Sequence, residues 1–215
     1  KREILSKSKQ KLNIDQLLKK AFQLQVQGEK LEAAKYYSYL LKQGIKDYRI
    51  HSNYGTLLNE IGKTKEAEIE LRNAIALNPK YANAYYNLGV LFIGQGNLKE
   101  AELELKKAIK IKSDFTIAHY NLGIILKDLG RLKEAESYFQ KALKSDPQFT
   151  DAYLSLSTME ANEPSQKWWG KLFSESLLIN KNDRELVNIF FGRSNIFHRI
   201  EIGRAHVWTP VTDQS

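Results

Sequence analysis

The chain repeats itself every 34 residues over most of its length. A glycine marks each repeat, at Gly28, Gly62, Gly96 and Gly130. An alanine follows each of these glycines by five residues, and a second small residue precedes each of them by seven. A period of this length is typical of chains built from stacked supersecondary units, each of which buries its apolar face against its neighbours. The sequence therefore directs the search for function to a surface and not to a pocket.

Residues 82–115 show what one unit contains. Apolar and small residues at helical i, i+3, i+4, i+7 spacing share one face of a first helix: Tyr85, Leu88, Gly89 and Phe92. Gly96 then interrupts the pattern, as a tight turn between two helices requires. A second helix follows, with Ala101, Leu105, Ala108 and Ile109 as its inner stripe. Glycine inside a helix is unfavourable by about 1 kcal/mol against alanine, so Gly89 indicates a close approach of the two helices, which we expect opposite Ala101.

These residues resemble a known repeat family. The runs Tyr-Tyr-Asn-Leu-Gly at 85–89 and Gly-Arg-Leu-Lys-Glu-Ala at 130–135 resemble the signature of the tetratricopeptide (TPR) repeat. The resemblance covers residues 14–149 as four repeats, at 14–47, 48–81, 82–115 and 116–149. The first repeat departs from the pattern at Lys20 and Leu40, as terminal repeats do. The resemblance implies an all-α fold, a right-handed α-α superhelix (TPR solenoid) of antiparallel helix pairs.

The register decays after residue 149. We expect residues 150–183 to form a degenerate repeat or capping helices, including an amphipathic helix with Trp168, Leu172, Phe173 and Leu177 on its apolar face. Residues 184–201 read as the start of a further, truncated first helix that has no partner helix in this chain. Its core-facing residues are predicted to be Phe190, Ser194 and Phe197.

The last residues, 202–215, look like translated read-through of a sequencing-library adapter, with Trp208 standing for a stop codon read as tryptophan. The chain also has no initiator methionine. We therefore expect a bacterial fragment whose biological sequence ends near Ile200.

Composition and charge limit the possible classes of protein. No apolar run is long enough to span a membrane, and the absence of cysteine excludes disulfides and agrees with a cytoplasmic location. The net charge of +8 is concentrated at the start of the chain, where the first 20 residues hold seven basic and two acidic residues. We interpret residues 1–13 as a basic N-terminal arm. Such an arm can contact nucleic acid or anionic lipid, but we favour the interpretation that it is a solvated tail before the first helix.

The sequence offers no catalytic residue, metal site or cofactor site. His51 and His119 occupy equivalent core positions of their repeats, and His198 has no acidic or cysteine partner at ligand spacing. The run Gly94-Gln95-Gly96 does not follow a strand and is explained by the turn, so it is not a phosphate loop. We expect this chain not to be an enzyme by itself.

The remaining candidate is the face of the first helices opposite the core stripe, which lines the concave groove in TPR proteins. Repeat positions 2, 6 and 9 lie on this face. They supply the predicted peptide-binding residues Arg49, Asn53, Asn83, Asn87, Val90, Ile117, Asn121 and Ile124. Asparagine recurs at position 6, and its amide offers one acceptor and two donors to the backbone of an extended peptide.

The recurring asparagine resembles the asparagine ladder of TPR domains in O-linked N-acetylglucosamine transferases. It does not resemble the two-carboxylate clamp of chaperone-binding TPR domains, because the clamp asparagine is replaced by Thr56, Val90 and Ile124. The main interpretation is a scaffold that binds a peptide or protein segment in its groove. The alternative is the non-catalytic arm of a larger enzyme, because similar bacterial arrays continue into sulfotransferase-, glycosyltransferase- or methyltransferase-type domains.

Overall fold

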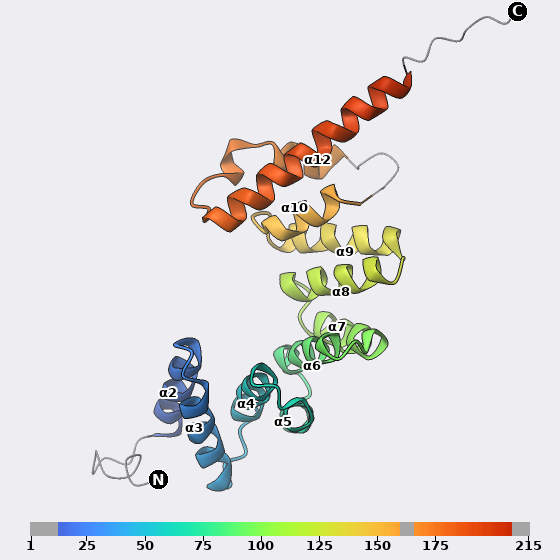
Figure 1. Cartoon of the computed structure of the whole chain (residues 1–215). Coiled ribbons are helices and arrows are strands. Elements are labelled where there is room, and N and C mark those ends of the chain that lie inside the picture. The colour runs from blue at the N-terminus through green and yellow to red at the C-terminus, as the bar shows by residue number, and fades with distance from the viewer. Residues whose placement is uncertain (1–12, 160–165, 208–215) are drawn as a thin grey trace, which may run out of the picture. The chain divides into compact units, whose positions relative to one another are not determined.

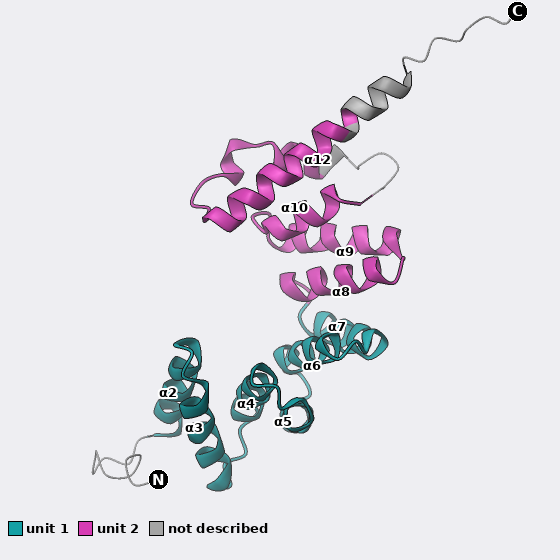
Figure 2. Cartoon of the chain, viewed as in Figure 1, with its two compact units in different colours: residues 1–112 teal, residues 113–215 magenta. Residues whose placement is uncertain are grey.

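A computed structural model describes residues 13–159 and 166–207. Every regular element in these two ranges is a helix (Figure 1), so the all-α prediction is confirmed for the described part of the chain. The chain divides into two compact units, residues 1–112 and 113–215, which Figure 2 colours separately. Each unit is described below by itself.

Within its described residues 13–112, the first unit contains three helix pairs. They are α2 (Ile14–Val26) with α3 (Lys30–Lys42), α4 (Tyr48–Glu60) with α5 (Thr64–Leu77), and α6 (Ala82–Gly94) with α7 (Leu98–Ile111). The second unit begins with the pair α8 (Thr116–Asp128) and α9 (Leu132–Ser145). It continues with α10 (Thr150–Ser157), α11 (Gln166–Leu172), the 3-10 helix η1 (Glu175–Leu177) and α12 (Asp183–Val207). The first helices α2, α4, α6, α8 and α10 begin 34 residues apart, in step with the repeat boundaries that we propose.

The repeated glycines end the first helices in a left-handed conformation. Gly96 has a φ of +74°, and the N–H of Asn97 donates to the carbonyl oxygen of Phe92 at 2.9 Å. This bond, with the one from Gly96 N–H to the carbonyl of Ile93 at 3.0 Å, closes the end of α6. Gly28, Gly62 and Gly130 adopt the same conformation after α2, α4 and α8. The 34-residue period therefore places the turns because only glycine adopts this backbone conformation without strain.

The middle first helices bury more than the predicted core stripe. In α6, Leu88 and Phe92 face α7 as predicted and are buried. Ala84 and Leu91 are also fully buried, although they lie outside the predicted stripe. The reason is that α6 contacts α4 and α5 of the preceding pair as well as its own partner α7. The stripe predicted from one repeat is thus the inner half of a wider buried arc.

Helix α12 corrects two sequence-based predictions. It was predicted to have no partner helix, but it packs against α10 and α11. The amide of Asn188 donates to Asp151 at 3.0 Å and that of Asn195 donates to Ser157 at 3.1 Å, so α12 runs parallel to α10. These bonds turn the helix so that Ile189 and Ile196 are buried.

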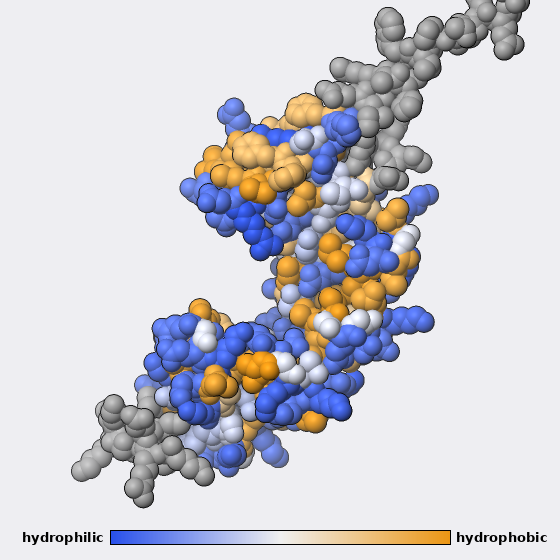
Figure 3. Space-filling model, in the orientation of Figure 1, coloured by the Kyte–Doolittle hydropathy of each residue, from blue (hydrophilic) through white to orange (hydrophobic). Residues whose placement is uncertain are grey.

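The prediction of which residues of α12 face the core is therefore wrong. Phe190 and Phe197 are more than half exposed, and Ser194 is exposed as well. Figure 3 shows apolar side chains gathered on the second unit, the unit that contains α12. The apolar residues of this helix lie on two faces, and the asparagines bonded to α10 decide which face is buried.

The predicted amphipathic helix after residue 164 is divided into two short elements. Trp168 and Leu172 of α11 and Leu177 of η1 are buried, as the pattern predicted. The side chain of Arg193 donates to the carbonyl oxygen of Leu172 at 3.0 Å, at the end of α11. Residues 1–12 of the predicted basic arm, which was placed at 1–13, lie outside the described residues, as does the end of the adapter-like segment at 208–215.

Candidate peptide-binding face

In the first unit, the residues at repeat positions 2, 6 and 9 of α2, α4 and α6 lie outside the core. We call the surface that they form the ladder face. It comprises Asp15, Lys19, Phe22, Arg49, Asn53, Thr56, Asn83, Asn87 and Val90. All nine residues are exposed or half-buried, whereas the stripe opposite is buried. Five of the eight predicted site residues therefore lie on neighbouring helices of one unit.

Each ladder asparagine of the first unit already makes one contact with the neighbouring structure. The amide of Asn87 donates to the hydroxyl of Ser52 on α4 at 3.3 Å. Asn53 hydrogen-bonds Tyr37 of α3, whose hydroxyl donates to Gln25 at 3.2 Å. Burial raises the pKa of Tyr37 to about 12, and the bond with Asn53 opposes that rise. An amide has two N–H donors and a carbonyl, so each asparagine retains one donor and its acceptor for a ligand.

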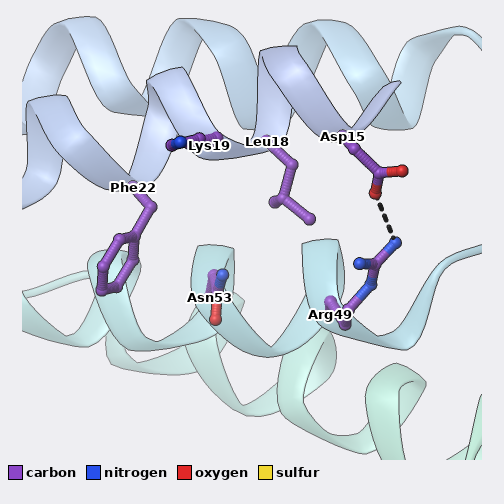
Figure 4. Close-up of a pocket in the computed structure, with 6 residues that line it drawn as sticks. All are labelled: Asp15, Leu18, Lys19, Phe22, Arg49 and Asn53. Atoms are coloured by element: carbon purple, nitrogen blue, oxygen red, sulfur yellow. Dashed lines mark hydrogen bonds and ion pairs between the residues drawn. The ribbon is translucent and has the colours of Figure 1, made fainter. Parts of the chain in front are cut away.

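A cavity of about 490 Å³ lies between α2 and α4 on the ladder face. Its lining is Asp15, Leu18, Lys19, Phe22, Arg49 and Asn53, as Figure 4 shows. Leu18 and the ring of Phe22 project from α2 into the gap, and Asn53 projects toward it from α4. The cavity thus combines two apolar side chains, one amide and three charged side chains.

The prediction missed the three ladder-face residues of α2, which are Asp15, Lys19 and Phe22. They stand at positions 2, 6 and 9 of the first repeat, so the 34-residue period contained the signal. Their residue types differ from those of the later repeats, and the first repeat departs from the pattern elsewhere. Phe22 is 52% exposed, so it adds one apolar side chain to the α2 part of the face, beside the charged Asp15 and Lys19.

Arg49 is engaged by carboxylates and does not project alone into the groove. Its guanidinium donates to both oxygens of Asp47, at 2.6 Å for the shortest contact, and to Asp15 at 2.9 Å across the cavity (Figure 4). These bonds lower the pKa of Asp47 and raise that of Arg49. Besides its predicted contact with a ligand, Arg49 therefore has a structural role, because its bond with Asp15 links α4 to α2.

The other three predicted residues lie in the second unit, all on α8. Ile117, Asn121 and Ile124 are half-buried, at one helical phase. On the neighbouring α10, Ser155 takes the place of the ladder asparagine, and its hydroxyl is 3.5 Å from that of Tyr120 on α8. Asparagine is therefore absent from position 6 after α8 in the described residues.

His51 and His119 make contacts within their repeats, and His119 is buried as predicted whereas His51 is half-buried. Nδ1 of His51 lies 2.6 Å from a carboxylate oxygen of Glu70 on the partner helix α5. His119 is buried, with Nε2 2.8 Å from the carbonyl oxygen of Ser113. Across the residues that the structure describes, no three His, Cys, Asp or Glu side chains gather as metal ligands would. None of the described helices is both long and apolar enough to cross a membrane.

Comparisons with known proteins agree with this geometry. Family models of the tetratricopeptide repeat match residues 116–149, and models of the TPR repeat match residues 55–96 and 91–130. Among solved structures, MamA from Desulfovibrio magneticus RS-1 aligns with a TM-score of 0.61 at 17% identity, over 84% of this chain and 96% of that one. None of the curated proteins matches the chain.

Two further structures carry the same fold. YrrB, described as a TPR protein with an unusual peptide-binding site, aligns with a TM-score of 0.58 at 19% identity, over 88% of this chain and 92% of that one. An O-GlcNAc transferase mutant from Thermobaculum terrenum aligns with a TM-score of 0.58 at 25% identity, over 63% of this chain but 27% of that one. The matched repeats, the paired helices and these likenesses agree. Residues 55–149 of the chain are tetratricopeptide repeats.

Proposed function

We propose that the chain is an interaction scaffold whose ladder face binds an extended peptide or protein segment. The observation that carries this proposal is the state of Asn87, which is half-buried and bonded to Ser52 through one N–H. That bond fixes the amide and leaves one N–H and the carbonyl for a ligand. A fixed amide loses little side-chain entropy when it binds, which favours association. YrrB, which has the same fold, is described as having a peptide-binding site.

An extended peptide offers what the ladder face can use. Its backbone alternates N–H and C=O groups, which match the remaining donor and acceptor of Asn53 and Asn87. Val90 and Phe22 would contact its side chains. Each amide–backbone bond contributes about 0.5–1.5 kcal/mol net, so binding requires several bonds and its affinity is modest. Recognition through the backbone would depend little on the sequence of the peptide.

The test is a double substitution at the ladder. We expect Asn53→Ala with Asn87→Ala to weaken capture of immobilised extended peptides about tenfold or more, because two amides of the ladder face are lost. Capture is measured by titrating wild-type and variant chains onto the same peptide array. The melting temperature should change little, since both side chains are half-buried and outside the core stripe.

The matched control is Asn73→Ala, which removes an exposed asparagine from the second helix α5. It should leave capture unchanged. If the double variant and wild type capture peptides equally, the asparagines are solvated surface residues and the proposal is wrong.

A second proposal is that the repeats form the non-catalytic arm of a larger enzyme. It is supported by the alignment with an O-GlcNAc transferase, of which this chain covers 27%. Reading the gene downstream of the codon for Ile200 tests it. A transferase-type domain in the same frame would support the arm, and a stop codon within a few residues would exclude it.

A further inference from the structure

A second cavity, of about 360 Å³, lies in the second unit between α9, α10 and α11. Its size is at the lower end of the range for ligand pockets in proteins. It belongs to the second unit, whereas the ladder face belongs to the first, and α9 and α11 contribute most of its lining. The lining residues are Gln140, Leu143, Lys144, Pro147, Tyr153, Trp168 and Lys171.

The described helices that follow α9 are shorter than α8 and α9. The first helix α10 has 8 residues where α8 has 13, and α11 has 7 where the second helix α9 has 14. Among the described residues, the seven-residue α11 is too short to cover the length of α9. The hydroxyl of Tyr153 donates to the carbonyl oxygen of Pro147 at 3.1 Å, and the Trp168 ring lies 6.4 Å from that of Tyr153. These contacts hold the apolar wall in place.

The charge of the lining is positive. Lys144 and Lys171 border the cavity, and neither has a carboxylate partner in the described part of the chain. Asp146, which is close in sequence, accepts a hydrogen bond from the backbone N–H of Gln148 at 2.8 Å. The cavity therefore presents an apolar interior beside two ammonium groups that form no ion pair with the described residues, and this favours an anionic partner.

We propose that this cavity binds an acidic peptide segment, with one apolar side chain inside the cavity and flanking carboxylates on Lys144 and Lys171. An apolar wall between two lysines matches an apolar residue between two acidic ones. Stacking of a nucleic-acid base is disfavoured, because Tyr153 and Trp168 are almost fully buried and present no open ring face. The site uses none of the ladder residues, so it stands independently of the proposed function.

The experiment titrates the full chain with the capped peptide acetyl-Asp-Leu-Glu-amide and with its neutral counterpart acetyl-Asn-Leu-Gln-amide. The readout is the indole N–H resonance of Trp168 in ¹H–¹⁵N spectra, assigned with Trp169→Phe and Trp208→Phe. We expect a saturable shift with the acidic peptide and a weaker response to the neutral one. Added salt should weaken binding of the acidic peptide, because exposed charge pairs are screened.

Two double variants decide the role of the lysines. Lys144→Gln with Lys171→Gln should weaken binding about tenfold, because each exposed charge pair contributes modestly. Lys99→Gln with Lys133→Gln removes the same charge from other exposed positions and should bind as the wild type does. Thermal melts establish that both variants fold.

Three outcomes overturn the proposal. They are no shift of the Trp168 resonance at about 10 mM peptide, equal affinity for the neutral peptide, and equal loss of affinity in both double variants. The concentration exceeds the millimolar dissociation constant expected for one apolar anchor and two exposed charges.

Discussion

At the scale of single residues, the small side chains in the first helices decide how closely each helix pair packs. A Cβ atom added to Gly89 would lie 2.9 Å from Cγ of Leu105 on α7, and one added to Gly123 would lie 2.6 Å from the ring of Phe139 on α9. Real Cβ atoms essentially never approach so closely. The sequence predicted a close approach at Gly89 opposite Ala101. The structure places Leu105 nearer, with the carbonyl oxygen of Ala101 at 3.5 Å.

The first prediction follows from this contact. Gly89→Leu should destabilise the chain by about 1–3 kcal/mol or more, because the added side chain overpacks the α6–α7 contact. Gly94→Leu is the matched control on the same helix, because a Cβ there meets nothing within 4 Å. Chemical denaturation followed by circular dichroism measures both variants. Equal stability of the two would show that the phase of α6 is assigned wrongly.

At the scale of elements, the ends of the helices combine local capping with contacts to other helices. Asp47 is the N-cap of α4, and its side chain accepts the backbone N–H of Arg49 at 2.8 Å. The same carboxylate receives the guanidinium of Arg49, which also reaches Asp15 on α2. One acidic residue therefore begins a helix and holds the arginine that links two repeats.

The second prediction concerns pH. Hydrogen bonds from Arg49 lower the pKa of Asp47 in the folded chain, so the unfolded chain binds the proton more readily. The stability that Asp47 contributes is therefore present above about pH 4 and is lost as the pH falls through the lowered pKa. Asp47→Asn keeps a capping oxygen and should remove this part of the acid sensitivity. Urea melts of both chains at neutral and acidic pH measure the difference.

The companion variant Asp47→Ala also loses the cap, and should be less stable at neutral pH by about 1 kcal/mol. If wild type and Asp47→Asn lose stability in parallel as the pH falls, the ion pair with Arg49 does not contribute to folding.

At the scale of the whole molecule, the sequence and the structure differ at the end of α12. The helix runs to Val207, which lies within the segment that resembles an adapter. Its described buried residues, Asn188, Ile189, Gly192 and Ile196, lie before that segment. The helical backbone can extend past the last packed turn because propagation adds one hydrogen bond per residue.

The third prediction is that deletion of residues 202–215 changes the free energy of unfolding by less than about 0.5 kcal/mol. Deletion of residues 187–215 is the control, because it removes Ile189 and Ile196 and exposes the face of α10 that they cover. It should destabilise the second unit strongly. A loss of more than about 1 kcal/mol from the shorter deletion would contradict the interpretation as read-through.

The sequence by itself determined the helix pairs, their turns and the inner core stripe. The 34-residue period was sufficient for these features, because helix phase and the left-handed conformation of the glycines are local properties that recur in every repeat. It also placed the predicted ladder residues outside the core. The same period places Phe22 and Lys19 there, although their residue types differ from those of the later repeats.

Only the tertiary structure decided how those side chains are used. The bond from Asn87 to Ser52, the pairing of Arg49 with Asp15 and the burial of Asn188 against α10 all join residues 34 to 38 positions apart. A periodic pattern fixes which way a side chain leaves its own helix. Whether that side chain then forms a hydrogen bond with another helix depends on how the next helix packs. The free energy of the bond must offset the cost of desolvating its polar groups. For the same reason the orientation of α12, whose apolar residues lie on two faces, followed from its contacts and not from its sequence.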